Sequence, residues 1–162
     1  MNKYLCSGEL FEQILPQKRP MLFVTALIEA DIEAMSGVVE CEVGKYDAVC
    51  LDENRNMKKT ALIEVMAQSI ASISGYKTYI LDKGFMEMGL LLSVRGCKIF
   101  AKTDIPCGTV LRINVTPFYL EGDINIFETK IVDEQNNIVA QAKITVTSVS
   151  KDKILELIGV NE

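Results

Sequence analysis

The stretch that determines the fold covers residues 60–80, reads TALIEVMAQSIASISGYKTYI and is mostly apolar up to Ile73. Between Ala61 and Ile73, apolar residues would occupy every side of an α-helix, which has 3.6 residues per turn. A helix that is apolar all round must be buried on all sides. The stretch therefore predicts one long buried helix, with Thr60 as a suitable N-cap residue.

Patterns typical of strands flank this helix. Before it, residues 22–30 and 35–44 predict two strands that form a hairpin. After it come four further predicted strands, at 88–101, 109–120, 124–134 and 138–148. Turn-forming residues separate these four, at 106–108, 121–123 and 135–137. The order predicts a hairpin, one buried helix and then an antiparallel meander.

This order favours an α+β fold in which a strongly curved antiparallel sheet wraps around one helix. Two short helices are expected at residues 8–15, with Ser7 as the cap, and at residues 151–158. We expect residues 1–162 to form a single domain, because the length matches one domain and no linker interrupts it. Such a sheet has an open edge and covers its helix incompletely, so we expect self-association.

The composition excludes several classes of protein. The formal net charge of −5 argues against nucleic acid as the main partner, because binding phosphates requires a surplus of Lys and Arg. No run of about 18 apolar residues is present, so no membrane span is expected. Residues 2–12 lack the apolar stretch of a secretory signal, and the five cysteines form no Cys-x-x-Cys pair. We therefore expect a cytoplasmic protein with reduced thiols.

The chain contains no histidine. This excludes an imidazole base and any metal site built on histidine, and we expect no metal site. A general base must come from Asp, Glu, Lys, Tyr or Cys. Asp47 and Asp52, in the loop before the helix, are either candidate bases or solvated loop charges. Cys50 in the same loop is the candidate for a nucleophilic thiol, and its alternative is a reduced, buried thiol.

Glu64 is the only charged residue between Lys59 and Lys77, and Gln68 follows it four residues later on the same face of the helix. One interpretation is structural, because the first turn of a helix favours an anion. The other is functional, because a carboxylate among apolar residues suits general acid–base chemistry. The pattern alone does not separate the two.

Four segments resemble the hot-dog-fold β-hydroxyacyl-thioester dehydratases of fatty-acid synthesis. Residues 62–68 (Leu-Ile-Glu-Val-Met-Ala-Gln) resemble the Ile-Glu-x-Met-Ala-Gln run on the central helix of that family. Residues 15–22, 89–95 and 106–111 are similar to its N-terminal segment and to the strand and turn after the helix. The resemblance spans about residues 9–147 and is greatest to the dehydratase-like proteins of aryl-polyene gene clusters.

This resemblance implies a hot-dog dimer that binds an acyl thioester at the subunit interface. The acyl group would arrive on the phosphopantetheine arm of an acyl carrier protein or of coenzyme A, with no other cofactor. The implied catalytic residues are Glu64 and its hydrogen-bonding neighbour Gln68. Backbone amides at Ser93 and Val94 are implied to polarise the thioester carbonyl.

Two further sets of residues have a functional and a structural interpretation. Four methionines either line a flexible acyl tunnel or simply pack in the core: Met21, Met66, Met86 and Met88. Five basic residues either dock an acidic carrier protein or form solvated surface: Lys58, Lys59, Arg95, Lys98 and Lys102. On a regular strand Arg95 faces the opposite side from Lys98 and Lys102.

The chain also departs from the family pattern. The family histidine that abstracts the α-proton is absent from the loop at residues 45–59, and Gln17 and Thr25 stand where many relatives show His and Asp. Three interpretations stay open. The chain is a dehydratase that uses Glu64 with a second group, or a non-catalytic acyl-binding or heterodimer subunit, or a thioesterase in which Glu64 activates water.

Overall fold

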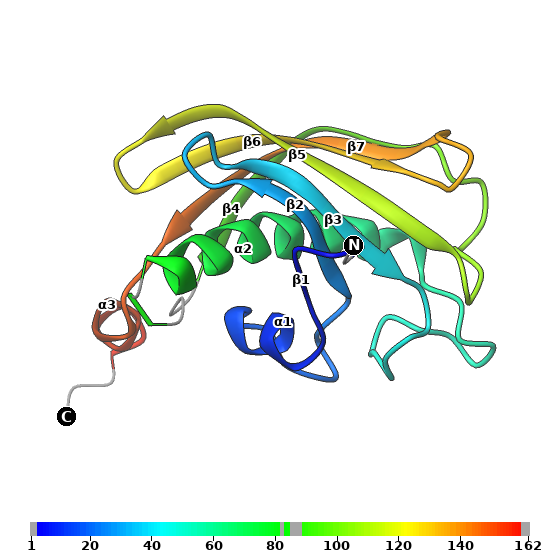
Figure 1. Ribbon diagram of the computed structural model, residues 1–162, viewed down its shortest axis with the longest axis horizontal. Helices are drawn as coiled ribbons and strands as arrows, with labels where there is room; N and C mark the ends of the chain where they lie inside the picture. The colour runs from blue at the N-terminus through cyan, green and yellow to red at the C-terminus, as the bar shows by residue number, and fades with distance from the viewer. Residues whose placement is uncertain (1–2, 82, 85–88, 160–162) are drawn as a thin grey trace.

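The computed structural model describes residues 3–81, 83–84 and 89–159, with the side chains of Lys151 and Leu157 left out. Its seven strands form one sheet in the order β1-β2-β3-β5-β6-β7-β4, and all neighbours are antiparallel. The sheet curves over the long helix α2 (Figure 1). The strands are β1 Cys6–Ser7, β2 Ala26–Asp31, β3 Ser36–Glu42, β4 Gly89–Ile99, β5 Val110–Glu121, β6 Ile124–Val132 and β7 Ile138–Ser148. The helices are α1 Gly8–Ile14, α2 Leu62–Ile80 and α3 Lys151–Leu157. The predicted curved sheet around one helix is confirmed.

The start of α2 differs from the prediction. A 3-10 turn, Lys59–Ala61, precedes the helix, so Thr60 lies inside this turn and the N-cap is Ala61. The prediction that Thr60 caps the helix was wrong. The side chain of Asp104, far along the chain, accepts a hydrogen bond from the Lys59 amide at 2.9 Å. A distant carboxylate therefore satisfies an amide at this end of the helix, a role that the local sequence does not reveal.

The core lies between α2 and the inner face of the sheet, which is the face turned toward α2. Alternating residues of the strands supply it, as expected for a sheet with one buried face. On β3 and β5 the buried apolar residues are Val39, Cys41, Leu111, Ile113 and Val115. On α2 they include Leu62, Val65, Met66, Ile70 and Ile73.

Helix α1 packs against α2 at Gly75. A Cβ atom at this position would lie 2.1 Å from the carbonyl oxygen of Ile14, so only glycine permits this close approach. Ser7 is the N-cap of α1 as predicted, although its side chain makes no capping hydrogen bond. The contact fixes the N-terminal segment against the C-terminal half of the long helix.

The two edges of the sheet differ in length. At one edge β1 comprises only Cys6–Ser7, whereas at the other edge β4 comprises Gly89–Ile99. Within the described residues β4 pairs only with β7, so one side of this long strand has no strand partner there. Of the helices in the described residues, none is long and apolar enough to cross a membrane.

Candidate functional site

Glu64 and Gln68 meet on the first turns of α2. The Gln68 side-chain amide donates a hydrogen bond to Oε1 of Glu64 at 2.9 Å. Gln68 is fully buried, whereas Glu64 is half-buried. No cation of the described residues pairs with Glu64. The structure therefore holds one carboxylate at the helix start, oriented by a buried amide and still partly open to solvent.

Gln68 also binds the backbone of the segment before β2. Its Nε2 donates to the Met21 carbonyl at 2.7 Å, and its Oε1 accepts from the amides of Phe23 at 2.8 Å and Val24 at 3.4 Å. Because backbone amides are donors, these bonds assign the oxygen and nitrogen of the side-chain amide. The orientation of the amide, and with it the bond to Glu64, is thus set by the protein backbone.

These bonds explain an error in the sequence prediction. A strand was predicted over residues 22–30, but β2 begins only at Ala26. The amides of Phe23 and Val24 are bound by the Gln68 side chain instead of a neighbouring strand. Thr25, next in the chain, is buried and bonds to β3 through its hydroxyl and its amide. A side chain from α2 therefore replaces the strand ladder at this point.

One stripe of α2 remains only half-buried by its own chain. Apart from the adjacent pair at its start, its members are spaced three or four residues apart, as expected for one helix face. They are Ile63, Glu64, Ala67, Ala71 and Ser74. The sheet and α1 cover the other sides. Glu64 thus lies at one end of a mostly apolar stripe of small residues that this chain leaves incompletely covered.

The loop before α2 is held by its own charged residues. Arg55, with a positive φ of 63°, donates to the carboxylate of Asp47 and to the carbonyl of Gly44. Asp52 Oδ1 accepts from the amides of Asn54 and Asn56, at 2.8 and 2.9 Å. The hydrogen bond from Arg55 lowers the pKa of Asp47. Both aspartates therefore act as structural groups of the loop. This favours their interpretation as loop charges over their interpretation as bases.

Cys50 lies in the same loop and is buried. Its carbonyl accepts from the Lys58 amide at 3.0 Å, which closes the loop toward the helix. Burial raises the pKa of its thiol. A raised pKa disfavours the thiolate, so the environment of Cys50 does not activate it as a nucleophile or base.

Among the described residues, no hydrogen bond joins the other predicted site residues to Glu64. Met66 is fully buried in the core, and Met21 is 46% exposed. Ser93 and Val94 lie on the edge strand β4, opposite Thr145 and Ile144 of β7, and the Ser93 hydroxyl donates to Thr145 Oγ1 at 3.0 Å. Their role toward a thioester stays a prediction. Met86 and Met88 lie outside the described residues.

The basic residues of β4 share a face that the alternation rule did not predict. Arg95 pairs with Lys143 and Lys98 pairs with Gln141, so three steps along β4 match two steps along β7. This is a β-bulge, and Gly96 within it has a φ of +58°. The extra residue places Arg95 and Lys98 on the same face of the sheet. The expectation that they face opposite sides was wrong.

Comparison with known proteins identifies the family. The model of a family described as ApeP-like, the ApeP dehydratases, matches residues 10–157, which is most of the chain. This chain belongs to the ApeP-like dehydratase family. This confirms the expected resemblance to hot-dog dehydratases, and in particular to the dehydratase-like proteins of aryl-polyene gene clusters. A search of curated proteins finds no match to this ApeP-like chain.

Solved structures share the fold of the ApeP-like chain. The dehydratase heterocomplex ApeI:P from Xenorhabdus doucetiae aligns with a TM-score of 0.80 and 21% identity, covering 96% of this chain and 98% of that one. The PaaI protein of E. coli, from a phenylacetic acid degradation operon, aligns with a TM-score of 0.55 and 13% identity over 75% and 80% of the two chains. A hypothetical thioesterase with coenzyme A from Streptococcus pneumoniae aligns with a TM-score of 0.51 and 14% identity, covering 71% of this chain and 79% of that one.

Proposed function

We propose that this ApeP-like chain is a subunit of a β-hydroxyacyl-thioester dehydratase in which Glu64 is the acid. The observation that carries the proposal is the half-buried Glu64 carboxylate, held at 2.9 Å by the buried amide of Gln68 at the start of α2. The helix N-terminus and the fixed amide orient this carboxylate before substrate binds. Family membership supports dehydration as the reaction.

In this reaction a base removes a proton from the α-carbon of the acyl thioester. The β-hydroxyl group accepts a proton from the Glu64 carboxylic acid and leaves as water. The electron pair of the broken Cα–H bond forms the new double bond, so the products are an enoyl thioester and water. Glu64 then regains a proton from the base through solvent. The acyl thioester, on a carrier protein or coenzyme A, is the substrate, and no further cofactor takes part.

The base is assigned to a related hot-dog subunit, because this chain has no histidine. Asp47 and Asp52 are engaged within their loop, and burial raises the pKa of Cys50. Two features favour a second subunit beside Glu64, namely the half-buried stripe of α2 and the unpaired side of β4. The structural relative that is a dehydratase heterocomplex is consistent with such a pairing.

The test is a thioester assay on the purified chain, alone and co-expressed with a histidine-containing hot-dog dehydratase. Enoyl absorbance and free thiol are followed together with 3-hydroxyacyl and saturated acyl thioesters of coenzyme A. We expect enoyl formation in the co-expressed complex and a loss of about 10²–10⁴-fold in the Glu64→Gln variant. Glutamine retains an oxygen that accepts from Gln68, so the variant keeps the local structure.

The matched control is Glu134→Gln, in the exposed turn between β6 and β7. It should leave the rate unchanged. Thiol release that depends on Glu64, without enoyl formation, would replace the proposal by thioester hydrolysis. A complex whose enoyl formation is insensitive to Glu64→Gln would make this chain a non-catalytic acyl-binding subunit.

A further inference from the structure

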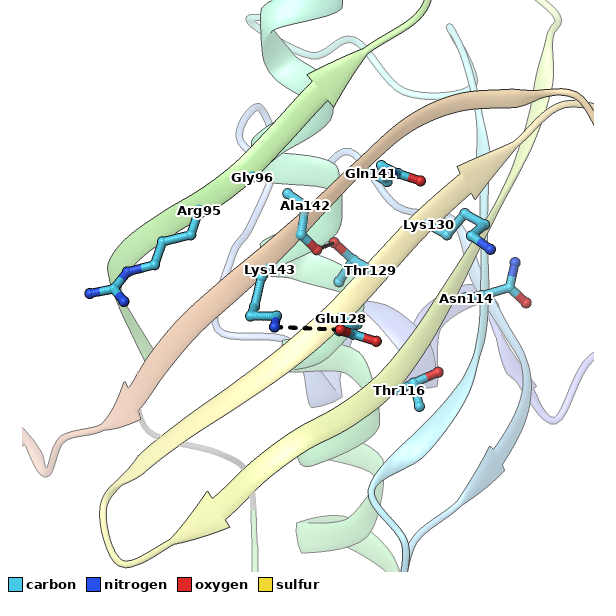
Figure 2. Close-up of a pocket in the computed structure, with 10 residues that line it drawn as sticks. All are labelled: Arg95, Gly96, Asn114, Thr116, Glu128, Thr129, Lys130, Gln141, Ala142 and Lys143. Atoms are coloured by element: carbon cyan, nitrogen blue, oxygen red, sulfur yellow. Dashed lines mark hydrogen bonds and ion pairs between the residues drawn. The ribbon is translucent and has the colours of Figure 1, made fainter.

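The outer face of the sheet, turned away from α2, carries a groove that does not include Glu64. Figure 2 shows this groove, lined from four strands by polar and charged side chains. The register across the sheet arranges residues of this outer face in two rows, and Lys98, which does not line the groove itself, belongs to one of them through its pairing with Gln141. One row is Asn114, Lys130, Gln141 and Lys98, and the next is Thr116, Glu128, Lys143 and Arg95. The bulge at Gly96 is what brings Arg95 and Lys98 into these rows.

The groove concentrates positive charge on an acidic chain. The two rows contain four cations and the single carboxylate of Glu128, while the whole chain has a net charge of −5. Within the described residues Glu128 pairs with Lys143 at 3.5 Å, and no carboxylate pairs with Arg95, Lys98 or Lys130. Three exposed cations therefore face solvent together without internal neutralisation.

An exposed aromatic ring adjoins these cations. Phe118, at the bulge between Pro117 and Tyr119 on β5, is 57% exposed. The ammonium group of Lys143 lies 3.4 Å from its ring centroid. An exposed aromatic ring within a charged rim is typical of protein–protein interfaces, where aromatic residues are enriched.

We infer that this outer face, formed by Arg95, Lys98, Lys130, Lys143 and Phe118, docks an acidic amphipathic helix of a partner protein. The two rows cross four strands, a width of about 15 Å at the spacing of neighbouring strands. That width accommodates one helix, whose diameter with side chains is about 10–12 Å. Carboxylates on such a helix meet the unpaired cations, and an apolar residue between them meets Phe118.

Other occupants fit this face less well. A second copy packed face to face would place these cations against one another, which like-charge repulsion opposes. A small anion requires donors that converge on one buried point, but here the unpaired cations are exposed and spread over different strands. The sheet also separates this face from α2, the helix that carries Glu64 (Figure 1), so docking here does not deliver the thioester. This surface is independent of the proposed function.

The experiment measures binding of a fluorescein-labelled helical peptide that carries glutamate at every third or fourth position and one leucine per turn. A peptide with glutamine in place of each glutamate is the control probe. We expect the acidic peptide to bind with an affinity that falls as salt is added, and the neutral one to bind at least tenfold more weakly. We expect Lys98→Glu with Lys130→Glu to weaken binding of the acidic peptide at least tenfold.

The matched control variant is Lys83→Glu with Lys153→Glu, which changes net charge equally at exposed sites off the sheet. It should retain affinity within twofold. The inference is overturned if no acidic peptide binds at millimolar concentration, if both double variants lose affinity equally, or if anionic lipid vesicles bind in place of the peptide. It is also overturned if Lys98→Glu with Lys130→Glu lowers the oligomeric mass, because the face would then join copies. We expect the dehydratase activity of the Lys98→Glu with Lys130→Glu variant to be unchanged. That result would show that the outer face acts independently of the Glu64 site.

Discussion

The two faces of the sheet organise polar groups in opposite ways. Beneath the inner face, Gln68 makes four hydrogen bonds from one buried amide, three to backbone groups and one to Glu64. The outer face carries four exposed or half-exposed cations, and within the described residues only one of them, Lys143, forms an ion pair. Burial makes each bond beneath the sheet necessary, because an unpaired buried group costs free energy. Exposure leaves the outer charges available for a partner.

This comparison has consequences for stability. Polar residues beneath the sheet should be sensitive to substitution, since water cannot replace their lost partners. Residues of the outer face should tolerate substitution and change binding instead. Variants at matched positions therefore test whether the two faces have the separate roles proposed here.

The largest effect is expected for Gln68→Leu. It leaves the buried Phe23 amide without its partner, breaks the partly buried bond to the Met21 carbonyl, and releases Glu64. We expect the free energy of unfolding to fall by about 2–4 kcal/mol, measured by urea denaturation. Ser69→Ala is the control, because among the described residues that hydroxyl bonds only to the Val65 carbonyl of its own helix. A loss no greater than that of the control would contradict the proposed role of the amide.

An intermediate effect is expected for Gly96→Ala. No atom lies within 4 Å of a Cβ added here, so the cost arises from the positive φ of 58° alone. A residue with a side chain pays about 1–2 kcal/mol in this region, and we expect that loss in urea denaturation. Binding of the acidic peptide should weaken as well, because the bulge aligns Arg95 with Lys98. Cys97→Ala, at the exposed neighbour, should change neither quantity.

The smallest effect is expected for Lys143→Met. It removes the ion pair with Glu128 and the contact with the Phe118 ring, both of which are partly exposed and screened by solvent. We expect a loss of less than about 1 kcal/mol in the free energy of unfolding. Lys130→Met, which breaks no ion pair of the described residues, should lose still less. A loss above 2 kcal/mol for Lys143→Met would show that the outer face also supports the fold.

Much of the fold was predictable because its signals are local. The apolar stretch at residues 60–80 predicted α2, and alternating residues predicted the strands of the meander. The spacing of Glu64 and Gln68 predicted their shared helix face, and the structure confirms the contact. The resemblance of residues 62–68 led to the family, which the match over residues 10–157 confirms.

Other features depend on residues that are distant in sequence. Asp104 binds the amide that begins the turn before α2, and Gln68 binds the backbone at Phe23, 45 residues away. Such bonds form only after the chain has folded, so no local pattern predicts where β2 begins. The alignment of Arg95 with Lys98 likewise depends on the register between β4 and β7.

Residue type and spacing are thus enough to predict which residues are apolar, which helix is buried and which carboxylate that helix carries, because periodicity reports these properties directly. The orientation of Glu64, the open side of α2 and the set of cations that share the outer face become visible only in the folded chain. These properties depend on hydrogen bonds and strand register between distant segments, and one bulge residue is enough to reverse the face that a side chain occupies.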